Sequence, residues 1–86
     1  MTHLASSRFW SCYDRLPAQT RAQADKQFEL LKRDSSHPSV RLKKVGRFWS
    51  ARVDSGTRAI AVEHDGKLIW FWIGSHGEYE QLIKRG

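Results

Sequence analysis

The segment IWFWIGSHGEYEQLI (residues 69–83) opens with five consecutive apolar residues and then turns polar. An uninterrupted apolar run is typical of a β-strand that lies inside a sheet and is covered on both faces. Ser75 and Glu78 then match a capping box, the S-x-x-E pattern that marks a helix N-terminus. The segment therefore predicts a central strand followed directly by a short helix, which begins at His76 and carries Tyr79 on its apolar side.

Upstream of this segment, the apolar residues alternate as they do in strands. FWSARV (residues 48–53) and RAIAVE (residues 58–63) each read as a strand, and DSGT between them reads as a turn. Asp65–Gly66 is a strong signal for a tight hairpin turn into the central strand. Val40 and Leu42 alternate with basic residues and suggest one more strand. The pattern predicts a meander of about four antiparallel strands.

The first part of the chain has helical spacing instead. In SRFWSCYDRL (residues 7–16), apolar residues recur at i, i+4 and i+7, as they do on one face of a helix. Pro17 ends this helix and can open the next one, in which Ala24, Phe28 and Leu31 line one face. We therefore expect an α+β fold, with a two-helix N-terminal hairpin packed on a roughly four-stranded antiparallel sheet and a short C-terminal helix.

The chain is basic, with 15 Lys and Arg against 9 Asp and Glu and a formal net charge of +6. Its length suits one domain, which we take to span residues 1–86. The charge fits a polyanionic partner, either nucleic acid or an acidic protein segment, or equally a surface charged for solubility. Cys12 is the single cysteine, and no apolar run approaches the ~20 residues that span a membrane. We expect a cytoplasmic protein with no membrane partner.

The basic residues concentrate between Arg41 and Arg58. Arg52 and Arg58 lie inside apolar strands close to the DSGT turn, where they can face each other across the hairpin. Two guanidinium groups this close repel unless an anion lies between them, and a phosphate is the natural anion. Alternatively, the basic residues decorate a solvated sheet edge and block aggregation. The remaining candidates for binding nucleic acid are Arg41, Lys43, Lys44 and Arg47.

His76 is the candidate for proton transfer. At the first position of the predicted helix it lies at the positive end of the helix dipole, which favours the neutral imidazole that accepts a proton. Tyr79 shares its helical face and can orient the imidazole or stack on a base. The simpler alternative is an ordinary helix start beside a half-buried core tyrosine. The histidines and the single cysteine show no metal-ligand spacing, and no glycine-rich phosphate loop is present, so we expect no metal and no cofactor.

In order and spacing, these motifs resemble the RelE/ParE superfamily of bacterial toxins, which are the toxin halves of type II toxin–antitoxin pairs. The likeness covers residues 9–83. It rests on LP (residues 16–17) before the second helix, SARV…G.R (residues 50–58) in the hairpin and IGSH.EY (residues 73–79) at the end. The resemblance implies a cognate antitoxin as protein partner.

The resemblance also implies an activity. RelE-type members are similar in cutting mRNA on the ribosome without a metal, by attack of a ribose 2′-hydroxyl on the adjacent phosphate. Carried over by position, Arg52 and Arg58 would hold the phosphate. His76 would be catalytic, and Tyr79 would stack on or orient the substrate. The implied function is an endoribonuclease, or mRNA interferase, that inhibits translation.

Two features depart from the family pattern. Ser50 falls where the best-known branch carries a catalytic lysine, so His76 would have to act as the base. The strand that usually precedes the helices is not evident in MTHLASS (residues 1–7). The missing lysine leaves an alternative open, a non-catalytic binding module that is either a ParE-type inhibitor of DNA gyrase or a degenerate toxin.

Overall fold

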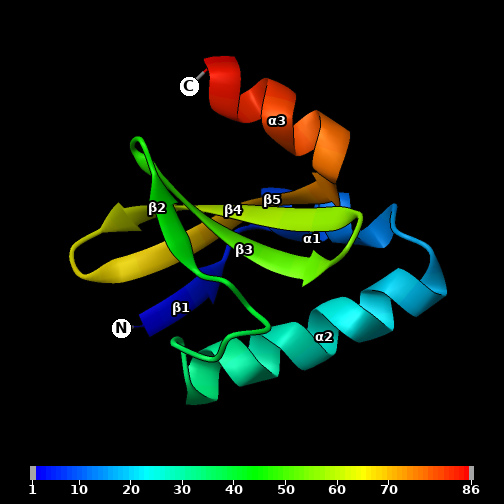
Figure 1. Ribbon diagram of the computed structural model, residues 1–86, viewed down its shortest axis with the longest axis horizontal. Coiled ribbons are helices and arrows are strands. Elements are labelled where there is room, and N and C mark those ends of the chain that lie inside the picture. Colours follow the sequence, from blue (N-terminus) through cyan, green and yellow to red (C-terminus); the bar gives the residue numbers. More distant parts are fainter. Residues whose placement is uncertain (1, 86) are drawn as a thin grey trace.

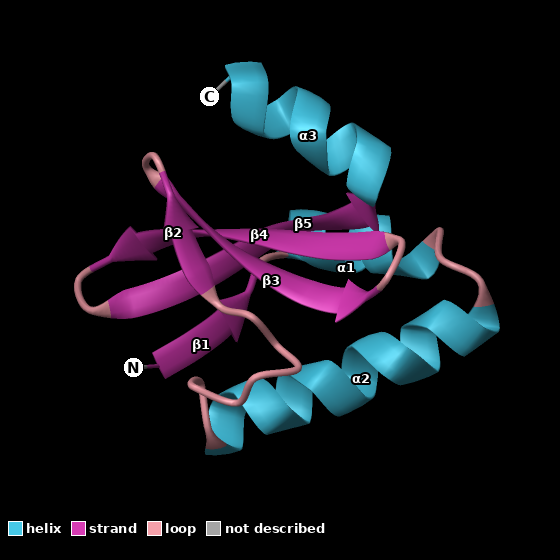
Figure 2. Cartoon of the chain, viewed as in Figure 1, coloured by secondary structure: helices cyan, strands magenta, loops and turns pink. Residues whose placement is uncertain are grey.

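The computed structural model describes residues 2–85, which form a five-stranded sheet with helices on both faces (Figure 1, Figure 2). Its elements, in chain order, are β1 (Thr2–Ala5), α1 (Ser7–Asp14), α2 (Ala18–Arg33), β2 (Lys43–Val45), β3 (Phe48–Asp54), β4 (Thr57–His64), β5 (Lys67–Ser75) and α3 (His76–Arg85). The strand order is β1-β5-β4-β3-β2, so the apolar strand β5 lies inside the sheet. The α+β fold with a helix pair, a mainly antiparallel sheet and a C-terminal helix is confirmed.

The first two helices lie where their spacing predicts them. The hydroxyl oxygen of Ser6 accepts a hydrogen bond from the backbone N–H of Phe9 at 3.2 Å and so caps α1. Pro17 stands immediately before α2, where its missing N–H has no hydrogen bond to lose. The Tyr13 hydroxyl donates to a carboxylate oxygen of Asp25 at 2.7 Å, which links the two helices.

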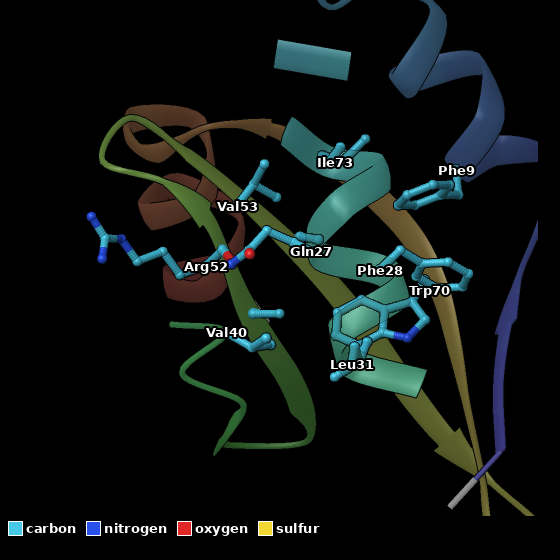
Figure 3. Close-up of a pocket in the computed structure, with 12 residues that line it drawn as sticks. Phe9, Gln27, Phe28, Leu31, Val40, Arg52, Val53, Trp70 and Ile73 are labelled. Carbon is cyan, nitrogen blue, oxygen red and sulfur yellow. The ribbon is translucent and has the colours of Figure 1, made fainter. Parts of the chain in front are cut away.

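The face of the sheet under α1 and α2, which we call the covered face, holds the main core. Alternating side chains of β3, β4 and β5 point to it, and Ala61, Leu68 and Trp70 are at most 1% exposed there. Phe9 and Leu31 pack on them from α1 and α2. A cavity of about 30 Å³ lies between α2 and the sheet (Figure 3), with room for little more than a water molecule. This cavity is therefore too small for a substrate, and the side chains around it stabilise the fold.

The fifth strand, β1, is the element that the sequence did not predict. It pairs with β5 in parallel, from Thr2 opposite Lys67 to Ala5 opposite Trp70. The indole N–H of Trp70 donates to His3 Nδ1 at 3.2 Å, and this hydrogen bond connects β1 to the core. β1 is only four residues long and half of them are exposed, so its own alternation carries little signal. It forms because β5 offers an unpaired edge, which only the three-dimensional structure reveals.

The segment before β3 also differs from the prediction. β2 begins at Lys43, and the alternation of Val40 and Leu42 does not make a strand. Arg41 adopts a left-handed backbone with φ of 49° that turns the chain between these two residues. Val40 is thereby buried, and its carbonyl oxygen accepts from the backbone N–H of Arg52 at 2.7 Å. The predicted tight turn at Asp65–Gly66 is confirmed, because both residues have positive φ.

Two irregularities in strand pairing shape the opposite face of the sheet, on which α3 lies and which we call the open face. The register shift between β4 and β5 leaves Phe71 without a partner, and a second shift between β3 and β4 leaves Val53 without one. Bulges of this kind bend the strand and redirect side chains. Trp72 thereby packs with Ile60 and Tyr79 in a small cluster under α3.

Candidate functional site

Two arginines on the open face form the centre of the candidate site. Arg52 of β3 and Arg58 of β4 are directly opposite each other in the register of the hairpin, as the sequence predicts. Directly opposed residues of antiparallel strands project from the same face. The guanidinium of Arg52 points away from the cavity on the covered face (Figure 3). The two positive charges are therefore held side by side by backbone pairing.

The surroundings of Arg58 hold its guanidinium in place. Its Nη1 donates to the backbone carbonyl oxygens of Asp54 and Thr57, the second at 2.9 Å. Burial and, to a smaller extent, the neighbouring charge of Arg52 lower the pKa of Arg58. An arginine stays protonated in spite of such a shift, so the energetic cost of burying its charge next to Arg52 remains. A bound anion would offset this cost, which makes the site suited to phosphate.

His76 is fixed beside these arginines by the start of α3. The predicted capping box is present, because Glu78 N–H donates to Ser75 Oγ at 3.2 Å and Ser75 N–H donates to Glu78 Oε1 at 3.4 Å. The backbone N–H of His76 donates to the carbonyl oxygen of Gly56 at 2.9 Å. This bond joins the first residue of α3 to the turn between β3 and β4, the hairpin that carries both arginines.

The imidazole of His76 has two neighbours that set its orientation. Its Nδ1 lies 3.1 Å from Glu80 Oε1, and its ring stacks on Tyr79 with a centroid distance of 5.8 Å and an interplanar angle of 29°. In the tautomer with its proton on Nδ1, the imidazole donates to this carboxylate and has the free lone pair on Nε2. Tyr79 is also buried in the cluster with Ile60 and Trp72, so it is a core residue as well as the support of the histidine.

A single pocket of about 100 Å³ collects these side chains, and we call it the cationic pocket. Its lining residues come from the β2 strand and the loop before it, from β3, from β4 and from α3. They are Arg41, Lys43, Ser50, Arg52, Arg58, His76 and Tyr79. Among the described residues 2–85, no carboxylate lines this pocket. The structure thus brings together all four of the predicted catalytic residues and two of the predicted nucleic-acid-binding residues.

The other two basic candidates lie outside the cationic pocket. Lys44 is opposite Trp49 in the register of β2 and β3, which places it on the other face from Lys43. Arg47 lies in the turn between these strands, with its guanidinium 5.1 Å from the centre of the Phe48 ring. Their predicted contact with nucleic acid stays a prediction.

Sequence reasoning missed two residues that support the site. Gln27 of α2 is 7% exposed, and its amide donates to the backbone carbonyl oxygens of Ser39 and Arg52, each at 3.1 Å. It therefore ties α2 to the strand that carries Arg52. Glu80 is the second, and its spacing of four residues from His76 within a helix is a signal that could have identified it.

The donor set of the cationic pocket suits an anion, because ammonium and guanidinium groups cannot ligate a metal ion. Within residues 2–85, no group of three or more His, Cys, Asp or Glu side chains is placed to hold a metal. Over the same residues, every helix is too short or too polar to cross a membrane.

Comparison with known proteins gives a likeness in fold. The sequence matches no protein-family model and no curated protein. A chain of the RelB–RelE antitoxin–toxin complex from Methanococcus jannaschii is 12% identical, with a TM-score of 0.71 over 92% of this chain and 96% of that one. YafQ from E. coli strain BL21(DE3) is 15% identical, with a TM-score of 0.67 over 90% and 94% of the two chains. The YoeB/ParE toxin from Agrobacterium tumefaciens is 16% identical, with a TM-score of 0.66 over 88% and 99%. The chain therefore has the fold of the RelE/ParE toxins.

Proposed function

We propose that this chain is the toxin of a type II toxin–antitoxin pair and that it inhibits translation in the cytoplasm as a metal-independent, ribosome-dependent mRNA endoribonuclease. The RelE-type fold supports the toxin role. The observation that supports the reaction is the cationic pocket, in which His76 lies beside the opposed pair Arg52 and Arg58 with no carboxylate in the lining.

The chemistry of RNA cleavage matches these groups. The 2′-hydroxyl attacks the adjacent phosphorus, the new O2′–P bond forms and the P–O5′ bond breaks, which leaves a cyclic phosphate and a 5′-hydroxyl. His76 accepts the proton of the 2′-hydroxyl at Nε2. Arg52 and Arg58 neutralise the negative charge that grows on the phosphate oxygens. Tyr79, stacked on the imidazole, holds it in position.

The proposed partner is an antitoxin with an acidic or amphipathic segment. A formal net charge of +6 on 86 residues attracts such a segment and repels other cationic chains. The similar chain from Methanococcus jannaschii belongs to an antitoxin–toxin complex. A segment that covers the cationic pocket would block substrate and neutralise the arginines at once, so we expect excess antitoxin to abolish activity.

The direct test expresses the wild type, Arg58→Ala and His76→Ala in bacteria and maps mRNA cleavage on translating ribosomes. Lys67→Ala is the matched control, because it removes an exposed positive charge from the same sheet but outside the cationic pocket. We expect Lys67→Ala to cleave and to arrest growth like the wild type. Each pocket variant should lose about 10²–10⁴-fold in cleavage rate. Equal cleavage by all four proteins would remove the proposed site.

A second candidate function has its own observation. Ser50, only 2% exposed, lies in the cationic pocket at the position where the best-known RelE branch carries a catalytic lysine. A pocket without that lysine fits a ParE-type module that binds DNA gyrase and cuts no RNA. Inhibition of gyrase supercoiling by the purified chain, with intact mRNA in expressing cells, would support this candidate and contradict the first.

A further inference from the structure

The neighbour of Ser50 across the strand pair is a lysine. In the antiparallel register of β2 and β3, Lys43 is directly opposite Ser50. Opposed residues of this kind share a face of the sheet, with Cβ atoms about 4.5–5.5 Å apart. Both residues line the cationic pocket. The amino-bearing side chain of Lys43 therefore borders the pocket from the strand next to the one that carries Ser50.

The residues around Ser50 leave space for this amino group. On the β4 side, Ser50 is opposite Ile60, which is 1% exposed and packs under Tyr79. The apolar wall formed there has no group that exchanges protons. A serine side chain is short, and the four-carbon stem of a lysine is long enough to reach over it. Lys43 itself is exposed and takes part in none of the ion pairs found within residues 2–85.

The reaction needs a second group that transfers protons. When the P–O5′ bond breaks, the leaving oxygen needs a proton while His76 takes one from the 2′-hydroxyl. The guanidinium groups of the cationic pocket do not release protons near neutral pH. Tyr79 is buried and stacked on His76. Among the lining residues, Lys43 is the exposed amine that remains as a candidate to give the proton.

Resting on the proposed RNA cleavage, we propose that Lys43 is a catalytic residue that donates the proton to the 5′ leaving oxygen. His76 Nε2 accepts the proton of the 2′-hydroxyl, the O2′–P bond forms, and the P–O5′ bond breaks with its electron pair moving to O5′. O5′ then receives a proton from Lys43 Nζ. Solvent returns one proton to Lys43 and removes one from His76, so that charge and atoms balance over the cycle.

The test uses ribosome-bound RNA in two forms, one with the normal P–O5′ bond and one with sulfur in place of that oxygen. A thiolate leaves without being protonated, so the sulfur substrate does not need the acid. We expect Lys43→Ala to lose about 10²–10⁴-fold on the oxygen substrate and to cleave the sulfur substrate within a few-fold of the wild type. Lys67→Ala, which changes an exposed lysine of β5 outside the cationic pocket, should match the wild type on both.

The possible outcomes separate this inference from the proposed function. Full activity of Lys43→Ala on the oxygen substrate overturns the role of Lys43, and so does an equal loss on both substrates, which would show that Lys43 only binds RNA. In both cases, loss of cleavage by Arg58→Ala and His76→Ala would still support the proposed nuclease function. If the wild type cleaves neither substrate, the proposed function itself is wrong. Activity on the sulfur substrate also proves that Lys43→Ala is folded.

Discussion

On the covered face, β3 and β4 present Ala51 and Ala59 to the helix pair, whereas on the open face the same strands present Ser50 and Arg58 to the cationic pocket. One face has its apolar side chains closed under two helices. The other has only a small apolar cluster under α3, and next to it unpaired positive charge. The difference shows how a chain of 86 residues separates stability from chemistry by the alternation of strands. Substitutions on the covered face should therefore mainly lower stability, whereas substitutions in the cationic pocket should mainly lower cleavage.

The largest expected effect is on the covered face. Trp70 is 1% exposed at the centre of the core, and Trp70→Ala should lower the free energy of unfolding by about 3–5 kcal/mol. A small domain has little more than that in total, so this variant should be largely unfolded. Urea denaturation followed by circular dichroism measures it. Trp10→Ala is the control, because Trp10 is 45% exposed and should change stability little. Similar curves for the two variants would contradict the assignment of the core to this face.

A glycine on the open face should give the next effect. Gly74 is opposite Arg58 in the sheet, and a Cβ on it would lie 2.5 Å from Cζ2 of Trp72. Because Trp72 is packed against Tyr79, Gly74→Ala should cost about 1–3 kcal/mol and also slow cleavage. Gly77→Ala is the matched control in α3, where an added Cβ meets nothing within 4 Å. A Gly74→Ala protein as stable as Gly77→Ala would show that Trp72 moves freely.

Gln27 tests whether the two faces are independent. Gln27→Leu keeps the size of the side chain but leaves the backbone carbonyl oxygens of Ser39 and Arg52 without their donor. We expect a loss of about 1–3 kcal/mol in stability and a several-fold loss of cleavage, since β3 loses the hydrogen bond that links it to α2 at Arg52. Gln19→Leu, on the exposed side of the same helix, is the control. Unchanged cleavage would mean that the open face does not depend on α2.

The smallest expected effect is the pH dependence of stability that comes from His3, which lies on β1 at the edge of the core. Burial, and secondly the charge of the N-terminus, lower the pKa of His3 from its ordinary 6.5. As pH falls, His3 of the unfolded chain takes up a proton at a higher pH than His3 of the folded protein. The contribution of neutral His3 to stability is therefore complete above pH 6.5 and is lost as pH falls through the lower pKa of the folded state. Urea denaturation of wild type and His3→Gln on both sides of pH 6.5 measures it. The variant should lose less stability in acid, and parallel curves would exclude His3 as the cause.

Most of the fold could be predicted because its signals are local. The alternation in residues 48–53, the Asp65–Gly66 turn and the Ser75–Glu78 capping box each depend on neighbours within a few positions. The opposition of Arg52 and Arg58 was predictable for the same reason, since a short hairpin fixes its own register.

The rest depends on contacts between segments that are distant in sequence. The pairing of β1 with β5 and the bonds from Gln27 to the loop and to β3 leave no periodic trace in the chain. The left-handed turn at Arg41 is equally hidden, because a positive φ is unusual for any residue but glycine. That turn sets where β2 begins and hence that Lys43 meets Ser50. The sequence could therefore name Lys43 as a candidate for binding nucleic acid but could not place it opposite Ser50.

The parallel pairing of β1 has a consequence for how the molecule is made. Thr2 pairs with Lys67, so β1 stays unpaired during synthesis until the chain has passed β5. High contact order of this kind slows folding, and synthesis from the N-terminus delays it further. His76 and Tyr79 emerge later still. A nascent polypeptide that has not yet reached α3 thus has the arginines without the histidine, and its cationic pocket is incomplete.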